Sequence, residues 1–72
     1  MKLNNEVKLI ISGYFNKGID DLTTRMNSCS SVIKSGSLDA DGTEYMRQVR
    51  NNYQTAAHEL ARLSKQMWDS ND

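Results

Sequence analysis

The sequence predicts an all-α fold, an antiparallel two-helix hairpin in a single domain over residues 1–72. Two helical seams and a break between them lead to this prediction. In the second half, steps of three and four residues separate apolar or small residues at Met46, Val49, Tyr53, Ala56, Leu60, Leu63 and Met67. A strand has a period of two and cannot place these side chains on one face, whereas a helix can. We therefore expect a helix over about residues 42–69.

The first half of the chain predicts a partner helix over about residues 4–34. Asn4 and Asn5 are both suitable N-caps, and Glu6 would lie favourably in the first turn. The seam of this helix also follows steps of three and four, through Phe15, Ile19, Leu22, Met26, Cys29 and Ile33. The two seams can therefore cover each other in an antiparallel pair.

A stripe of apolar residues at the N-terminus has the same spacing but a different register. It consists of Leu3, Val7, Ile10 and Tyr14. Gly13 and Gly18 flank the change of register, and each costs a helix interior about 1 kcal/mol relative to alanine. Either the helix bends there or its first three turns face a different surface.

The segment between the helices, residues 35–41, has the composition of a turn. Gly36 suits the left-handed position after a helix, and Lys34 is favourable in the last helical turn. Asp41 and Glu44 match a capping box, which predicts Asp41 as the N-cap of the second helix. A connection this short brings the helices back antiparallel.

Size and charge indicate which partners are plausible. A core of this size rarely supplies more than roughly 3–5 kcal/mol, and one cysteine excludes an internal disulfide. Two alternatives remain: association with another chain, either a partner protein or a second copy when the chain is alone, or acceptance of marginal stability. The net charge is +0 and the charges are interspersed, which argues against nucleic acid. No stretch approaches the ~20 apolar residues of a membrane span, and a lone cysteine fits the cytoplasm.

Catalysis and metal binding are not expected. Cys29 lies on a seam, whereas His58 lies on the face opposite its own seam, so the two cannot easily meet. The residues from Asp39 to Gly42 begin like a calcium loop, but the glycine comes too early and Arg50 takes the place of the final acid. We expect no enzyme activity, no cofactor and no metal.

Two surfaces are candidates for binding a partner. One is the N-terminal stripe of Leu3, Val7, Ile10 and Tyr14. The other is a row of small residues that ends in a tryptophan, Ala57, Ala61, Ser64 and Trp68, which would let another helix approach closely. Tyr45 and Leu38 add an apolar patch near the turn. Two other readings stay open: the alanines simply favour helix, or the stripe packs on Trp68 at the open end of the hairpin.

The chain resembles the small co-chaperones of type III secretion needles, the YscE/PscE/SsaE/EscE family. The resemblance lies in a first helix, a short turn with glycine and aspartate, and a tyrosine early in a second amphipathic helix, here Ser35 to Tyr45 followed by Ala56, Ala57 and Leu60. It implies a cytoplasmic bacterial protein that binds a helical-repeat co-chaperone. Together the two would keep the needle subunit soluble and unpolymerised, a role in protein transport and virulence.

Two alternatives remain at this point. One is a secreted helical hairpin of the WXG type, although the turn has no tryptophan. The other is a small helical regulatory or phage protein, for which the lack of a basic face argues against DNA binding.

Overall fold

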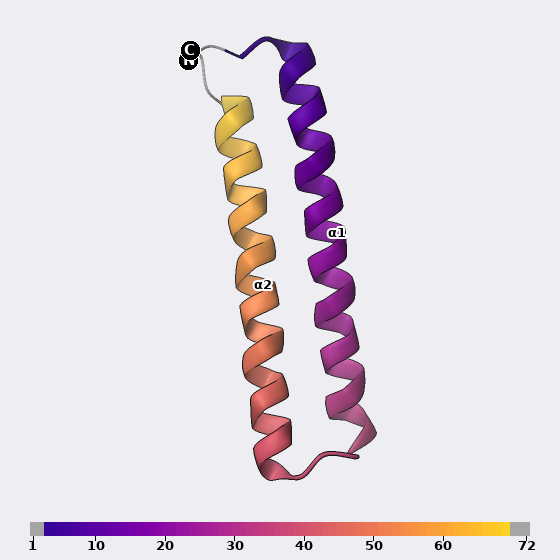
Figure 1. Ribbon diagram of the computed structural model, residues 1–72. Coiled ribbons are helices and arrows are strands. Elements are labelled where there is room, and N and C mark those ends of the chain that lie inside the picture. The colour runs from indigo at the N-terminus through magenta and orange to yellow at the C-terminus, as the bar shows by residue number, and fades with distance from the viewer. Residues whose placement is uncertain (1–2, 70–72) are drawn as a thin grey trace.

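The chain folds as an antiparallel helical hairpin, shown by a computed structural model that describes residues 3–69 (Figure 1). Helix α1 spans Asn5–Ser35 and helix α2 spans Ala40–Asp69. The described part of the chain contains these two helices and no strand, which confirms the predicted fold class. The hairpin is a rod of 51 × 15 × 12 Å.

The ends of α1 follow the predicted signals. The side chain of Asn4 accepts a hydrogen bond of 2.8 Å from the Val7 N–H, so Asn4 is the N-cap. At the other end Gly36 has φ 68°, and its N–H donates to the Ile33 carbonyl at 3.3 Å. This left-handed conformation favours glycine because a side chain there would be strained.

Helix α1 runs without interruption through both internal glycines. At Gly18 an added Cβ would lie 3.1 Å from Leu60 Cδ1, whereas at Gly13 it would meet nothing within 4 Å. Gly18 therefore lies where α2 comes close, and Gly13 faces open space. The two alternatives were a bend in the helix and a different orientation of its first turns. The second is found, because α1 is one continuous helix and its first turns carry apolar residues on a second face.

Helix α2 begins at Ala40, two residues before the predicted start. Its N-cap is Asp39, because Asp39 Oδ1 accepts a hydrogen bond of 2.7 Å from the Gly42 N–H. The prediction of Asp41 as the cap was therefore wrong; Asp41 lies in the first turn. A Cβ on Gly42 would be 3.4 Å from Leu38 Cβ. Capping at Asp39 thus lets Leu38 fold back over the first turn, where Gly42 leaves room.

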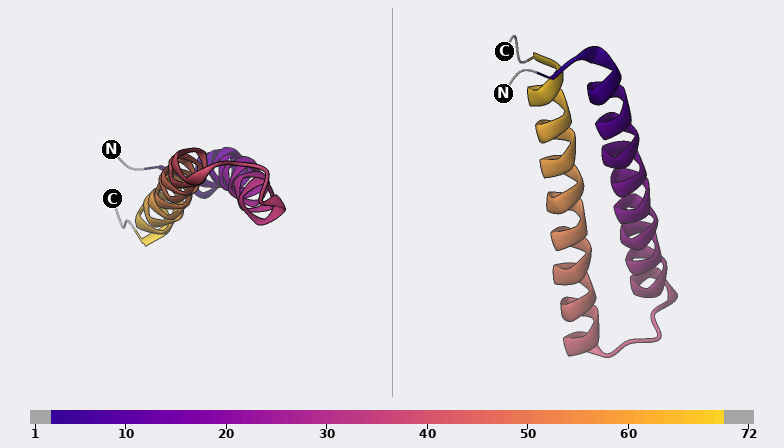
Figure 2. Two further views of the ribbon diagram at one scale, coloured as in Figure 1. Left: turned by 90° about the horizontal axis from the view of Figure 1, so that it is seen from below. Right: turned by 45° about the horizontal axis from the view of Figure 1, so that its top comes forward.

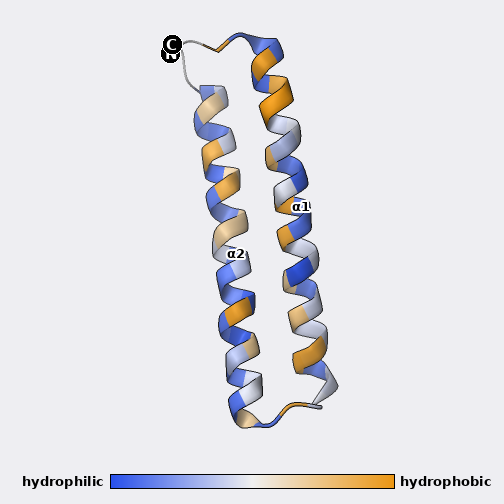
Figure 3. Cartoon of the chain, in the orientation of Figure 1, coloured by the Kyte–Doolittle hydropathy of each residue, from blue (hydrophilic) through white to orange (hydrophobic). Residues whose placement is uncertain are grey.

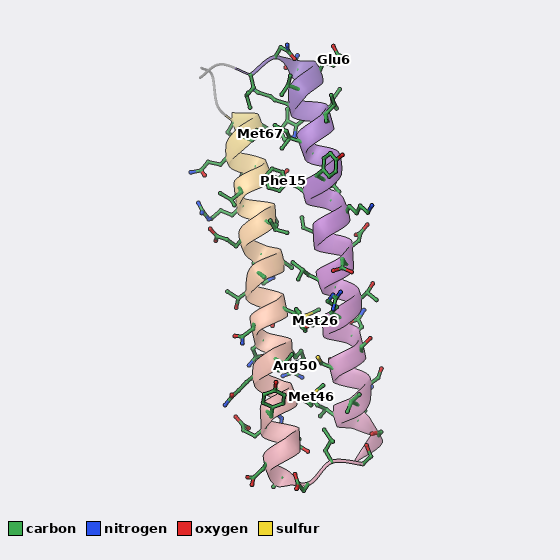
Figure 4. All side chains as sticks on the ribbon, viewed as in Figure 1. Glu6, Phe15, Met26, Met46, Arg50 and Met67 are labelled. Atoms are coloured by element: carbon green, nitrogen blue, oxygen red, sulfur yellow. The ribbon has the colours of Figure 1, made fainter. Side chains whose placement is uncertain are left out.

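The core is one layer of contacts between two helices. Figure 2 shows the two helices side by side, and residues 3–69 contain no further helix or strand that covers them. Phe15, Met26, Met46 and Met67 extend into the space between the helices (Figure 4). Of the apolar side chains described, Cys29 is the one that is buried, at 5% exposed. The other seam residues are at most half-buried.

Within residues 3–69, three ion pairs on the outer surfaces join side chains three or four positions apart. Asp21 and Arg25 are 3.0 Å apart, Glu44 and Arg47 are 3.7 Å apart, and Glu59 pairs with Arg62. All six side chains are more than half exposed. Ion pairs this exposed to solvent contribute little to stability.

Candidate functional site

At the open end of the hairpin, Trp68 joins α2 to α1. Its indole N–H donates a hydrogen bond of 2.6 Å to Ser12 Oγ. Lys8 Nζ lies 5.9 Å from the centre of the ring, within the range of a cation–π interaction. Lys8 is 7% exposed, and its aliphatic stem can fill a seam position that an apolar residue would otherwise take. Trp68 therefore holds the C-terminal end of α2 against α1.

The same end of the hairpin holds an apolar pocket of about 460 Å³. Its lining consists of Leu3, Lys8, Ile11, Phe15, Leu63, Gln66 and Met67. Trp68 and Leu63 are five positions apart on α2, which is about 140° around a helix. The hairpin thus has two broad sides, one marked by Trp68 and one by Leu63.

Five large apolar side chains share the Leu63 side, and we call this set the Leu63 face. They are Ile10 (58% exposed), Tyr14 (76%), Val32 (36%), Tyr45 (65%) and Leu63 (37%). Tyr14 follows the pocket residue Ile11 by three positions, so the two are surface neighbours. Val32 lies 18 positions after Tyr14, and Tyr45 lies 18 positions before Leu63. Eighteen residues are five helical turns, so each pair points in one direction.

Between its apolar ends, the Leu63 face carries opposite charges. Asp21 lies seven residues after Tyr14, and Arg25 lies seven residues before Val32. Asp21 Oδ2 accepts a hydrogen bond of 3.0 Å from Arg25 Nε. Hydrogen bonds with Asp21, and then with Tyr53 of α2, raise the pKa of the Arg25 guanidinium. The middle of the face is therefore polar and holds one acid and one base on α1.

A second carboxylate borders this face on α2. Glu59 lies four residues before Leu63, and its hydrogen bond with Arg62 lowers the pKa of the Glu59 carboxyl. The same hydrogen bond raises the pKa of Arg62. Glu59 is therefore charged at neutral pH, so a second carboxylate placed opposite it would be repelled.

The structure divides the predicted binding residues between the two sides. The N-terminal stripe and Tyr45 belong to the Leu63 side, with Leu3 and Val7 half-buried and the other three exposed. The small-residue row ends in Trp68 and follows its side, with Ala57 and Ser64 half-buried and Ala61 exposed. Trp68 contacts Ser12 and Lys8, neither of which belongs to the stripe. Apolar residues gather on the first turns of α1 (Figure 3).

Sequence reasoning missed four residues of this arrangement, Lys8, Ile11, Ser12 and Val32. A signal existed for two of them, because steps of four and three back from Phe15 reach Ile11 and then Lys8. The apolar stripe follows a different register, and Lys8 is not apolar, so the continuation of the Phe15 seam through Ile11 and Lys8 is not evident from apolar residues alone. Val32 lies 18 positions after Tyr14, but this spacing places the two on one face only because α1 continues through Gly18.

Residues 3–69 show no constellation for metal chemistry. No group of three or more His, Cys, Asp or Glu side chains among them could hold a metal ion. Cys29 is buried in the seam and His58 is exposed. Within the same range, neither helix is apolar enough over a sufficient length to cross a bilayer.

Comparisons with protein-family models, curated proteins and solved structures found no match.

Proposed function

We propose that this chain is a small cytoplasmic co-chaperone of a bacterial type III secretion system. In this proposal its Leu63 face docks on a helical-repeat chaperone, and the two proteins together hold the needle subunit soluble and unpolymerised. One observation carries the proposal. The hairpin is a single layer in which Cys29 alone of the described apolar side chains is buried, while five large ones share one face. The resemblance of Ser35 to Tyr45 to needle co-chaperones supplies the biological setting.

The energetic case is that a partner supplies the missing second layer. Fully burying a large apolar side chain stabilises by roughly 1.5–3 kcal/mol. A partner that binds only the folded hairpin adds stability by mass action, about 2.7 kcal/mol at one hundred times its Kd. Stacked helical repeats form extended concave surfaces, which suit a rod of 51 × 15 × 12 Å. The complex would then shield apolar helical surface that otherwise drives polymerisation.

The proposal is tested by co-expressing the full chain with helical-repeat proteins encoded beside it and purifying the product. We expect a stable heterocomplex. The double variant Tyr14→Glu, Tyr45→Glu should abolish it, because both side chains are mostly exposed and charges there would be buried by the partner. Leu9→Glu is the matched control, since Leu9 is also 64% exposed but lies about 140° from Tyr14 around α1.

A second variant separates the two sides of the hairpin. Ala61→Glu places a charge in the exposed part of the row that ends in Trp68. Loss of the heterocomplex in Ala61→Glu, with binding retained in the double tyrosine variant, would move the docking surface to the Trp68 side. Failure to form a heterocomplex with any helical-repeat candidate would refute the co-chaperone function.

A further inference from the structure

The surface area of the hairpin indicates an uncovered interface. The chain exposes 5502 Å², whereas a compact monomer of 8.2 kDa is expected to expose about 4,500 Å². The excess is about 1,000 Å² by the same relation. A standard interface buries about 800 Å² on each partner. The excess is therefore enough for one stable interface.

The apolar residues of the Leu63 face form one cluster near each end of the rod. Ser12 lies opposite Trp68, and Gly18 lies opposite Leu60, so Tyr14 and Leu63 are at nearly the same level near the open end. Val32 and Tyr45 lie near the ends of their helices at the turn.

These positions have a two-fold pattern along α1. Residue 23 is the midpoint between Tyr14 and Val32, and it is also the midpoint between Asp21 and Arg25. A two-fold axis across the helices at this level would place Tyr14 against Val32 of a second copy. The same axis would place Asp21 against Arg25 of the second copy, an acid against a base. One rotation thus matches both the apolar and the charged positions.

Helix α2 shows the same pattern at the same level. The midpoint between Tyr45 and Leu63 is residue 54. Gly18 lies opposite Leu60; residue 23 is five positions after Gly18 and residue 54 is six positions before Leu60, so residues 23 and 54 lie at nearly the same level of the antiparallel pair. The rotation that pairs the residues of α1 therefore also brings Tyr45 against Leu63 of the second copy.

We propose that the free chain forms an antiparallel two-fold dimer through the Leu63 face, a four-helix bundle in which the open end of each hairpin covers the turn end of the other. A two-fold interface uses one self-complementary patch on both copies, and this face meets that condition. An axis parallel to the helices would instead place Asp21 near Glu59 of the second copy, because Gly18 lies at the level of Leu60. Two carboxylates opposite each other disfavour that arrangement.

The dimer shares the Leu63 face with the proposed co-chaperone function but does not depend on that function. Because one face cannot be covered twice, the second copy competes with the helical-repeat partner. The dimer is then the resting form of the free chain, and partner binding separates it.

The test is sedimentation equilibrium on the full chain alone, from about 1 to 500 μM, a range that spans common homodimer affinities. We expect a mass of twice 8.2 kDa at the upper end. Tyr14→Glu should weaken dimerisation by at least about tenfold, while the control Leu9→Glu should not change it. A monomer mass for the unaltered chain at the highest concentration would overturn the inference and leave the co-chaperone proposal standing. A dimer that captures no helical-repeat protein would support the inference and refute the co-chaperone proposal.

Charge reversal tests the axis. Asp21→Arg or Arg25→Asp alone sets like charges against each other and should weaken the dimer by about tenfold. The double reversal restores opposite charges and should recover most of the affinity. Reversing Glu44 and Arg47, an equally exposed pair away from the face, is the control. If the double variant stays as weak as the single variants, the charges do not cross the axis.

Cysteine cross-linking fixes the register. Mixing Tyr14→Cys chains with Val32→Cys chains under mild oxidation should give a mixed disulfide, since Cys29 is buried and does not compete. A stronger cross-link between Tyr14→Cys and Leu63→Cys chains would indicate the axis parallel to the helices and overturn the antiparallel arrangement.

Discussion

At the scale of single residues, Trp68 and Lys8 decide how the open end of the hairpin is held. Lys8 occupies a seam position and is 7% exposed, with its Nζ 5.9 Å from the indole centre. Its stem provides apolar contact and its charge faces the aromatic ring. A tryptophan at the end of a row of small residues suggested an anchor for another protein. In the structure the same residue has contacts within its own chain.

The bond between Trp68 and Ser12 predicts a measurable effect of Ser12→Ala. Losing this hydrogen bond should lower the free energy of unfolding by about 0.5–1.5 kcal/mol. Urea denaturation followed by circular dichroism and by Trp68 emission measures this, because the chain has a single tryptophan.

Helix propensity is the effect to control for, since alanine favours helix over serine. Ser31→Ala makes the same substitution at an exposed position of α1. We expect Ser12→Ala to be less stable than Ser31→Ala, with a shift in Trp68 emission in Ser12→Ala only. Equal stabilities would mean that the bond to Ser12 contributes nothing.

At the scale of helices, the two internal glycines of α1 have different roles. An alanine Cβ at position 13 meets nothing within 4 Å, whereas at position 18 it lies 3.1 Å from Leu60 Cδ1. Gly13→Ala should therefore stabilise the chain by about 0.5–1 kcal/mol through helix propensity alone. Gly18→Ala should give less or even destabilise, because Leu60 must move. Urea denaturation of both variants is the measurement, and equal gains would show that α2 does not approach closely at Gly18.

Most of the fold was predictable from local signals. Asn4, Gly36 and the steps of three and four residues act within one helix, and these features gave the fold class and the start and end of α1 nearly as found. The N-cap of α2 was harder, because two aspartates two positions apart both fit local rules. Asp39 is used, and the choice involves Leu38 packing over Gly42, which sequence spacing does not reveal.

The candidate site was only partly predictable, for a physical reason. The sequence identified Tyr14 and Tyr45 as exposed apolar residues, but it could not show that they share a side that Trp68 does not. That relation depends on how α1 is rotated against α2. The rotation is set by the contacts of Lys8, Gly18 and Trp68 across the hairpin.

At the scale of the whole molecule, the fold is a rod with one layer of side chains inside. The Leu63 face therefore links stability to association, since a second layer comes from a second copy or from a partner. If the free chain is a dimer, its unfolding midpoint must rise with protein concentration, because unfolding separates the two copies.

The size of this rise follows from the length of the chain. Unfolding entropy is about 2.1 cal/mol/K per residue, so a hundredfold increase in concentration should raise the Tm of a dimer of this chain by about 10 °C. Calorimetry or circular dichroism at two concentrations measures the shift. Tyr14→Glu, whose substitution site is 76% exposed, should keep its helix content and show a smaller shift, because its copies associate less. A Tm of the unaltered chain that does not change with concentration would show that the single layer of α1 and α2 folds without a second copy.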